Sequence, residues 1–212
     1  GGTDVGGANS LTPVFHMSLH GGRGGDTRIM VDGLSTQNAE LAGQASNFLP
    51  NMGSAQELAI DYAAGAADQP TGGVRINLIP REGGNIFTGS FFVTGVNSAF
   101  QGDNYSDELR TLGLRTPDSI KANYDINPSG GGPIRRDSIW WYASARWNLN
   151  QNYVGDLFFN RNAGDPNAWT YAPDLERPAF SDFTQRSLNA RVTWQATPKH
   201  KFSVFVDDQD RC

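Results

Sequence analysis

The segment GGVRINLIPREGGNIFTGSFF, residues 72–92, joins two strand-like stretches of opposite character. In its first half, VRINLI, apolar residues alternate tightly, so a strand would place them all on one face. In its second half, which continues to residue 95, aromatic and apolar residues occupy both faces. A polar hinge at residues 81–85 separates the two. We therefore predict two structural units. Residues 1–82 form a sheet with one apolar face that packs on its own core, and residues 83–212 form strands without such a face.

Composition narrows the class of fold. The 212 residues carry a net charge of −5, so they show no basic surface typical of nucleic-acid binding. Mean hydropathy is −0.47, and no apolar run reaches the roughly 18 residues expected of a transmembrane helix. Twenty-five glycines and an aromatic content of 11% favour an all-β protein with many turns. A transmembrane β-barrel stays compatible with these numbers, because its signal is alternation and not overall hydropathy.

Four short strands are predicted in the first unit, each from apolar alternation. They cover residues 14–19, 27–31, 56–62 and 74–79. The second of them ends at Asp32 and Gly33, a dipeptide typical of tight hairpin turns. The connections between the strands are long and polar. The pattern indicates a small mixed sheet with large loops.

The second unit alternates in a way that suits a membrane-spanning wall. At odd positions from 139 to 149 the side chains are apolar, and at the even positions they become polar. The alternation recurs over 185–196, where the even positions are apolar. Each run covers about 9–11 residues, enough to cross a membrane as a tilted strand. The tryptophans on the apolar face, Trp141, Trp147 and Trp194, are predicted to lie at the membrane interface as an aromatic belt.

The lengths of the connections give a second indication of a barrel. Five strands are predicted in this unit, at residues 86–96, 120–128, 139–151, 184–196 and 202–208. Their connections alternate between long and short. Outer-membrane barrels have long external loops and short periplasmic turns, whereas a soluble sandwich has no reason to alternate this way. We therefore predict a mainly β protein, in which a small mixed plug sheet precedes an antiparallel meander that is part of a large transmembrane β-barrel.

The last hairpin has a predictable register. Apolar residues are even-numbered on both of its strands, over 188–196 and 202–206. Directly opposed residues of an antiparallel pair share a face, so the numbers of paired residues must sum to an even value. This condition pairs Trp194 with Phe202. A three-residue turn at 197–199 is the simplest loop that gives this register.

Three motifs resemble segments of TonB-dependent outer-membrane receptors, in particular their Oar-like branch. HGGRGGDTRIMVDGLS, residues 20–35, is similar to a plug segment of that family, and residues 56–92 are similar to its later plug segment and first barrel strand. GGGPIRRDSIWWYASARW, residues 130–147, is similar to a barrel segment of the Oar-like branch. His20 stands where the family usually has an arginine, which puts the usual plug–barrel Arg–Glu contact in question at that position. Arg75 stands where an apolar residue is common.

The resemblance implies a barrel of about 22 strands, of which this chain would hold the first five, with a signal peptide and TonB box upstream. It implies an energy-coupled receptor in the outer membrane of a Gram-negative bacterium. Such a receptor binds and imports a scarce solute, and siderophore, glycan and peptide all stay open. The implied partners are the TonB–ExbB–ExbD complex, outer-membrane lipid and the extracellular solute, with no nucleic acid.

Residues that contact the solute are predicted from two sources. In the family, the plug loops that flank the first plug strand face outward, as does the long loop that follows. The matching positions here are Asp4, Asn9, Arg23, Gln37, Asn38, Asn47 and Phe48. Trp169 and Tyr171 are added because they lie in the second long connection of the meander, where aromatic rings can pack on a ligand.

No catalytic or metal site is predicted. No nucleophile, base and oxyanion donors assemble in the sequence, so no enzymatic function and no cofactor are expected. His16 and His20 would lie about 13 Å apart on a strand, and the acidic stretch at 103–108 lacks the ligand order of a calcium loop. Two other functions stay open: a passive porin or adhesin barrel, and an extracellular β-sandwich that binds a ligand. A folded plug distinguishes the receptor from the porin.

Overall fold

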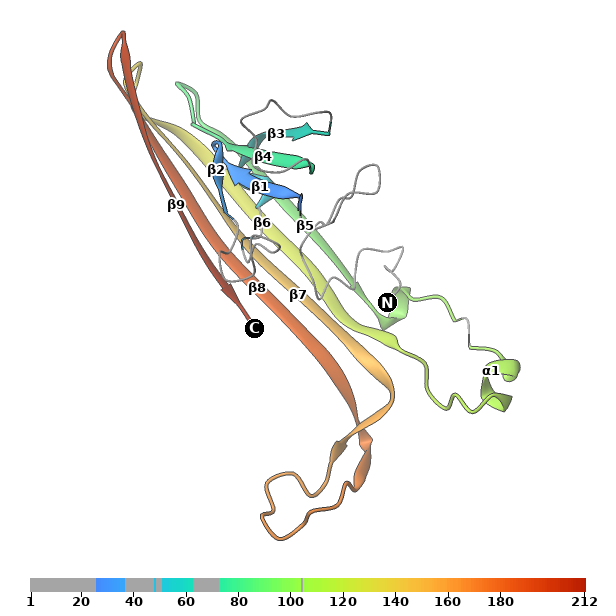
Figure 1. Ribbon diagram of the computed structural model, residues 1–212. Helices are drawn as coiled ribbons and strands as arrows, with labels where there is room; N and C mark the ends of the chain where they lie inside the picture. Colours follow the sequence, from blue (N-terminus) through green and yellow to red (C-terminus); the bar gives the residue numbers. More distant parts are fainter. Residues whose placement is uncertain (1–25, 37–47, 49–50, 63–72, 104) are drawn as a thin grey trace.

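The computed structural model of the chain contains two β-sheets (Figure 1). It describes residues 26–36, 48, 51–62, 73–103 and 105–212. A four-stranded sheet has the strand order β2-β1-β4-β3, and a five-stranded sheet has the order β5-β6-β7-β8-β9. These two sheets confirm the predicted mainly β fold class. Within the described residues, no helix is long and apolar enough to cross a membrane.

The small sheet combines parallel and antiparallel pairing, as predicted. Its strands are β1 (Arg28–Val31), β2 (Leu34–Ser35), β3 (Ala55–Asp61) and β4 (Arg75–Pro80). β1 and β4 pair in parallel, whereas β2 and β3 run antiparallel to their neighbours. Asp32 and Gly33, which join β1 to β2, have φ values of 49° and 80°. Positive φ at both positions is the requirement of a type I′ turn. The strand predicted at 14–19 lies outside the described residues.

One face of the small sheet is apolar and buried. Its members are Ile29, Val31, Val74, Ile76 and Leu78. In the parallel register Ile29 lies beside Ile76, and Val31 lies beside Leu78. Every second residue of VRINLI therefore enters this core, which explains the tight alternation of that stretch.

The large sheet is an antiparallel meander, as predicted. Its strands are β5 (Thr88–Asn97), β6 (Ser119–Arg135), β7 (Ile139–Asn160), β8 (Pro173–Thr197) and β9 (His200–Arg211). Short turns join β6 to β7 and β8 to β9. Figure 1 shows the small sheet beside the end of the meander that carries these turns, and the short helix α1 (Asp107–Thr111) at the opposite end. Both long connections lie at that opposite end, which we call the loop end.

Four strands of the meander are longer than predicted, and one of them is β9, which covers 200–211 instead of 202–208. β6 continues to Arg135 instead of ending at 128, β7 continues to Asn160, and β8 begins at Pro173. The predicted loop at 152–183 is therefore mostly a protruding hairpin, closed by a connection at 161–172. The prediction ended these strands where apolar alternation ended. The strand pairing extends further, with Asn160 opposite Pro173, because a β-ladder does not depend on apolar alternation.

The register of the β8–β9 hairpin is as predicted, but its turn is not. Trp194 pairs with Phe202, as the even sum requires. However, Thr197 pairs with His200, and the register shifts between Gln195 and Thr197. A two-residue turn with a β-bulge at residue 196 thus replaces the predicted three-residue turn. The extra residue of the bulge restores the even sum that a plain two-residue turn would break.

Replacing Leu78 with alanine is expected to destabilise the small sheet. Leu78 is 1% exposed, and truncating a buried leucine costs about 2–5 kcal/mol through lost burial and a residual cavity. Hydrogen exchange at the backbone amides of β1 and β4 measures the loss. Leu58→Ala in β3 is the control, since Leu58 is partly exposed and its truncation should cost nearer to about 0.5 kcal/mol. Equal losses in the two variants would contradict this assignment of the core.

Candidate functional site

The face of the meander that points toward the small sheet is polar and buried. On β8 its side chains are those of Gln185, Ser187, Asn189, Arg191 and Thr193. The even-numbered side chains between them, such as Leu188 and Val192, are exposed on the opposite, outer face. A soluble sheet does the reverse, because its apolar face packs on the core and its polar face meets water. We call this buried polar face the inner face, and it is the candidate functional site.

A buried asparagine joins the small sheet's segment to the meander. Asn51 directly precedes the short helix η3 (Met52–Ser54) and is 1% exposed. Its Nδ2 donates to Ser144 Oγ on β7 (3.0 Å) and to Asn189 Oδ1 on β8 (3.3 Å). Its Oδ1 accepts a hydrogen bond from Asn127 Nδ2 on β6 (2.6 Å). One side chain is thus hydrogen-bonded to three adjacent strands.

These polar contacts continue across the inner face. Ser144 Oγ also donates to Asn189 Oδ1, and Asn189 Nδ2 donates to Asp207 Oδ2 on β9 (2.6 Å). Tyr142 OH donates to the carbonyl of Gly53 (3.3 Å). Each such bond adds only about 1 kcal/mol net, but leaving a buried partner unsatisfied costs about 1–3 kcal/mol. The network therefore specifies where η3 sits on the meander more than it adds stability.

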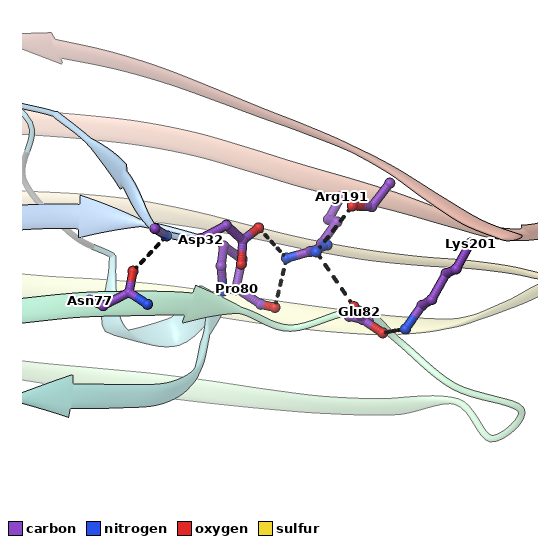
Figure 2. A network of polar contacts seen from close by, with 8 residues as sticks. Asp32, Asn77, Pro80, Glu82, Arg191 and Lys201 are labelled. Atoms are coloured by element: carbon purple, nitrogen blue, oxygen red, sulfur yellow. Dashed lines mark hydrogen bonds and ion pairs between the residues drawn. The ribbon is translucent and has the colours of Figure 1, made fainter. Parts of the chain in front are cut away.

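Arg191 holds the small sheet by ion pairs (Figure 2). Its side chain is 7% exposed, and its Nη1 donates to Asp32 Oδ2 (2.8 Å) and to the Pro80 carbonyl (3.1 Å). Its Nη2 lies 3.5 Å from Glu82 Oε1, and Lys201 on β9 forms a second ion pair with Glu82. The bases come from the meander, and the acids come from the β1–β2 turn and the linker after β4. We call Arg191, Lys201, Asp32 and Glu82 the latch.

The linker between the sheets is fastened to the turn end of the meander. Asn85 Oδ1 accepts from Trp140 Nε1 (2.7 Å) and from the Asp137 backbone amide (2.8 Å). Gly83 has a φ of 77°, and a Cβ there would meet the carbonyl oxygen of Trp141. Only glycine satisfies both conditions. The polar hinge at 81–85 is therefore a connection with defined contacts on the meander.

Carboxylates join the β5–β6 connection to the protruding end of β7 at the loop end. Asp156 accepts hydrogen bonds from the Arg115 amide (3.2 Å), the Thr116 amide (2.9 Å) and the Thr116 hydroxyl (2.9 Å). Gly155 N donates to Asp118 Oδ1 (2.6 Å). The hydrogen bonds from the Arg115 amide and the Thr116 hydroxyl lower the pKa of Asp156 below its ordinary value, because they stabilise the carboxylate. We call these contacts of Asp118 and Asp156 the loop clasp.

Three of the predicted solute contacts lie among the described residues. Trp169 is 93% exposed on the β7–β8 connection, and Tyr171, on the same connection, donates its hydroxyl to the Phe158 carbonyl (3.0 Å). Phe48 is half-buried. The other predicted contacts lie outside the described residues: Asp4, Asn9, Arg23, Gln37, Asn38 and Asn47.

The three tryptophans predicted at a membrane interface share the outer face of the meander. Trp141 and Trp147 occupy odd positions of β7, opposite outward-pointing residues of β8. Trp194 lies opposite Phe202, and the centroids of their rings are 6.0 Å apart. All three side chains point away from the inner face. Their placement at a membrane interface stays a prediction.

Sequence reasoning missed Asn51 and Arg191. Arg191 leaves a signal, because it is the one charged residue on the polar face of β8 between residues 185 and 195. A buried guanidinium needs acidic partners, so this position could have been picked out. Asn51 leaves none, since it lies in a polar stretch without periodicity. Among the described residues, no three potential metal-ligating side chains converge.

Comparison with known proteins supports the fold. No protein-family model and no curated protein matches the chain. Its structure is similar to the crystal structure of the siderophore receptor PirA from Acinetobacter baumannii, with a TM-score of 0.51 and 16% sequence identity. The match covers 88% of this chain and 24% of that chain, so this chain spans about a quarter of the receptor's length. Identity this low shows a shared fold, and function must be argued from the site.

Replacing Arg191 with glutamine is expected to loosen the β1–β2 turn. Removing one partner of a buried ion pair costs about 3–5 kcal/mol, and we expect about 2–3 kcal/mol here because both acids of the latch are a third exposed. The amides of Asp32 and Gly33, which donate to the Leu78 carbonyl and to Asn77 Oδ1, report the loss by faster hydrogen exchange. Arg186→Gln is the matched control, because Arg186 is exposed on the outer face of the same strand. The latch assignment fails if both variants exchange alike.

Replacing Asp156 with asparagine is expected to remove an acid-sensitive step from the loop clasp. The folded-state pKa of Asp156 lies below its ordinary value of 3.8. The carboxylate therefore stabilises the clasp fully above that ordinary value, and this contribution is lost as the pH falls through the folded-state pKa. The protection factor of the Thr116 amide, followed against pH, should drop in acid for the parent chain and stay level for the variant.

The control for this measurement is Asp165→Asn, which alters a carboxylate on the β7–β8 connection outside the clasp. This variant should keep the acid-sensitive step of the parent chain. An acid step of the same size in Asp156→Asn would show that another group titrates.

Proposed function

We propose that the chain supplies the plug, residues 1–82, and the first five wall strands, within residues 83–212, of a TonB-dependent receptor. This receptor lies in the outer membrane of a Gram-negative bacterium, binds a scarce solute outside the cell and imports it with energy from the TonB–ExbB–ExbD complex. One observation carries the proposal. A folded sheet lies on the buried polar face of a meander whose other face is apolar and exposed.

The outer face of the meander suits contact with lipid. In water its exposed apolar side chains would form a patch of the kind that marks an interaction surface. Ile139, the partner of Trp194, precedes Trp147 on β7 by eight residues (147 − 139). Eight strand residues of about 3.4 Å, tilted by about 40°, rise about 21 Å, close to the apolar band of about 25 Å in outer-membrane barrels. The exposed residues include Leu188, Val192, Val204 and Val206.

The contact between the two sheets suits a plug that moves. It is built from hydrogen bonds and ion pairs around Asn51 and Arg191. Water can replace such bonds when the plug and wall separate, so the net free energy of separation is small. In this proposal the latch takes the role of the family's plug–barrel Arg–Glu contact. The two sides are exchanged, because here the arginine belongs to the wall and the acids belong to the plug.

Solute capture is proposed at the outward plug loops and at the loop end of the wall. Of the predicted contacts, Trp169 is well placed, because its ring is exposed on a connection beyond the wall. The loop clasp would hold the β5–β6 connection against the protruding β7–β8 hairpin beside a bound solute. Release then follows when energy from the partner complex displaces the plug.

The geometry favours this function over the two alternatives. A passive porin or adhesin barrel has no need of a folded sheet on its inner face. A β-sandwich buries the apolar inner faces of its two sheets against each other. Here the face toward the small sheet is polar and the exposed face is apolar, which is the opposite arrangement.

Ion conductance in planar bilayers tests the proposed function. The full-length receptor is expected to conduct no current, because the plug fills the barrel. The same receptor without residues 1–82 is expected to form a large, permanently open channel. A full-length protein that already conducts would support a porin instead. A full-length protein that does not fractionate with the outer membrane would support a soluble binding module.

A further inference from the structure

Amide side chains dominate the inner face between the latch and the loop end. Four strands contribute them, and the register of the meander points each one inward. They are Asn123 on β6, Asn148, Asn150 and Asn152 on β7, Gln185 on β8 and Gln209 on β9. We call these six residues the amide lane.

The members of the amide lane are close neighbours. Asn148 lies directly opposite Gln185, and Asn150 lies directly opposite Asn123. Opposed residues on one face have Cβ atoms about 4.5–5.5 Å apart. From Asn148 to Asn152 the lane extends about 14 Å along β7. A solute with several hydrogen-bonding groups can therefore contact several amides at once.

The formal charges along the lane cancel. Arg146 and Asp125 neutralise each other in a two-point contact, with Nε to Oδ1 at 3.0 Å and Nη2 to Oδ2 at 2.6 Å. Asp207 and Arg211, which point inward on β9, add one charge of each sign. The described part of this surface therefore offers no excess charge to an ionic ligand.

Several polar atoms on and beside the lane are buried without a partner. Gln185 is 3% exposed, and its Nε2 has no hydrogen-bond partner. The same holds for Asn123 Nδ2 and for the hydroxyl of the adjacent Ser187. A buried polar group left unpaired costs about 1–3 kcal/mol, so each such group in a native protein needs an explanation. A ligand or water with acceptor atoms would supply the missing partners.

We infer that the amide lane binds an uncharged, hydroxyl-rich solute, namely an oligosaccharide, on its way through the receptor. This inference rests on the proposed function and names the substrate class for it. A hydroxyl both donates and accepts, as a carboxamide group does, so sugar hydroxyls match the unpaired donors and the amide oxygens together. An anionic ferric chelate calls for excess positive charge, and a free peptide brings charged termini. The lane offers no excess positive charge to the chelate, and its six amides offer no ion-pair partner to the termini of the peptide.

Titration calorimetry on the full-length receptor in detergent tests this inference. The neutral probes are maltohexaose, xylohexaose and cellohexaose, and the opposing probes are hexaalanine and a trianionic ferric tris-catecholate. At least one oligosaccharide is expected to bind, and the peptide and the chelate are not. Gln185→Glu and Asn150→Ala are expected to weaken that binding by roughly tenfold or more, because each removes a donor from the lane. Gln151→Glu should bind as the parent does, since Gln151 points outward between two lane residues.

Three outcomes would overturn the inference: binding of the chelate or the peptide more tightly than any oligosaccharide, no binding of any oligosaccharide, or equal loss in Gln151→Glu. Asn150→Ala adds no charge, so it keeps the test valid if Gln185→Glu fails to fold. Conductance of the same preparations separates this result from the proposed function. A plugged receptor that binds the chelate keeps the transport function and rejects the oligosaccharide, whereas a preparation without a plugged channel rejects both.

Discussion

On β8, Ser187, Asn189, Arg191 and Thr193 point to one face and are buried, while the apolar residues between them are exposed on the other. The pleat of a strand forces this separation, because successive side chains point to opposite faces. One face can then bind the small sheet through hydrogen bonds, while the other face contacts an apolar medium. This alternation determines where the small sheet binds to the meander. It also determines the positions of the latch, the amide lane and the exposed outer face.

Hydrogen bonds and ion pairs position the small sheet on the meander. Asn51 reaches three strands, and Arg191 bonds to the β1–β2 turn and to the linker after β4. Such contacts add little net free energy, but they tolerate only one arrangement, since any shift leaves buried groups unpaired. The small sheet also has its own apolar core around Leu78. A core of its own is what the proposed plug role requires, since the sheet would have to stay folded while its contacts with the meander open.

Local alternation was enough to predict both sheets and the pairing of Trp194 with Phe202. It was not enough for the ends of β7 and β8, because backbone pairing continues where apolar alternation stops. In the candidate site, the exposure of Trp169 followed from its place in a connection. Asn51 and Arg191 were missed because they bond to Ser144 and Asp32, residues 93 and 159 positions away in the chain. Contacts at such separations leave no periodic pattern, and only Arg191 has a local signal, as the one charged residue on the polar face of β8 between residues 185 and 195.

The most direct measurement of the central claim is spin-label accessibility along β8 in the full-length protein reconstituted in a bilayer. Single labelled cysteines at positions 187 to 193 would be compared for their collision rates with dissolved oxygen, which is concentrated in lipid. The account predicts a period of two, with high accessibility at 188, 190 and 192 and low accessibility at the odd positions. Uniform accessibility, or the opposite phase, would contradict the claim that the apolar face of this strand meets lipid and its polar face meets the plug.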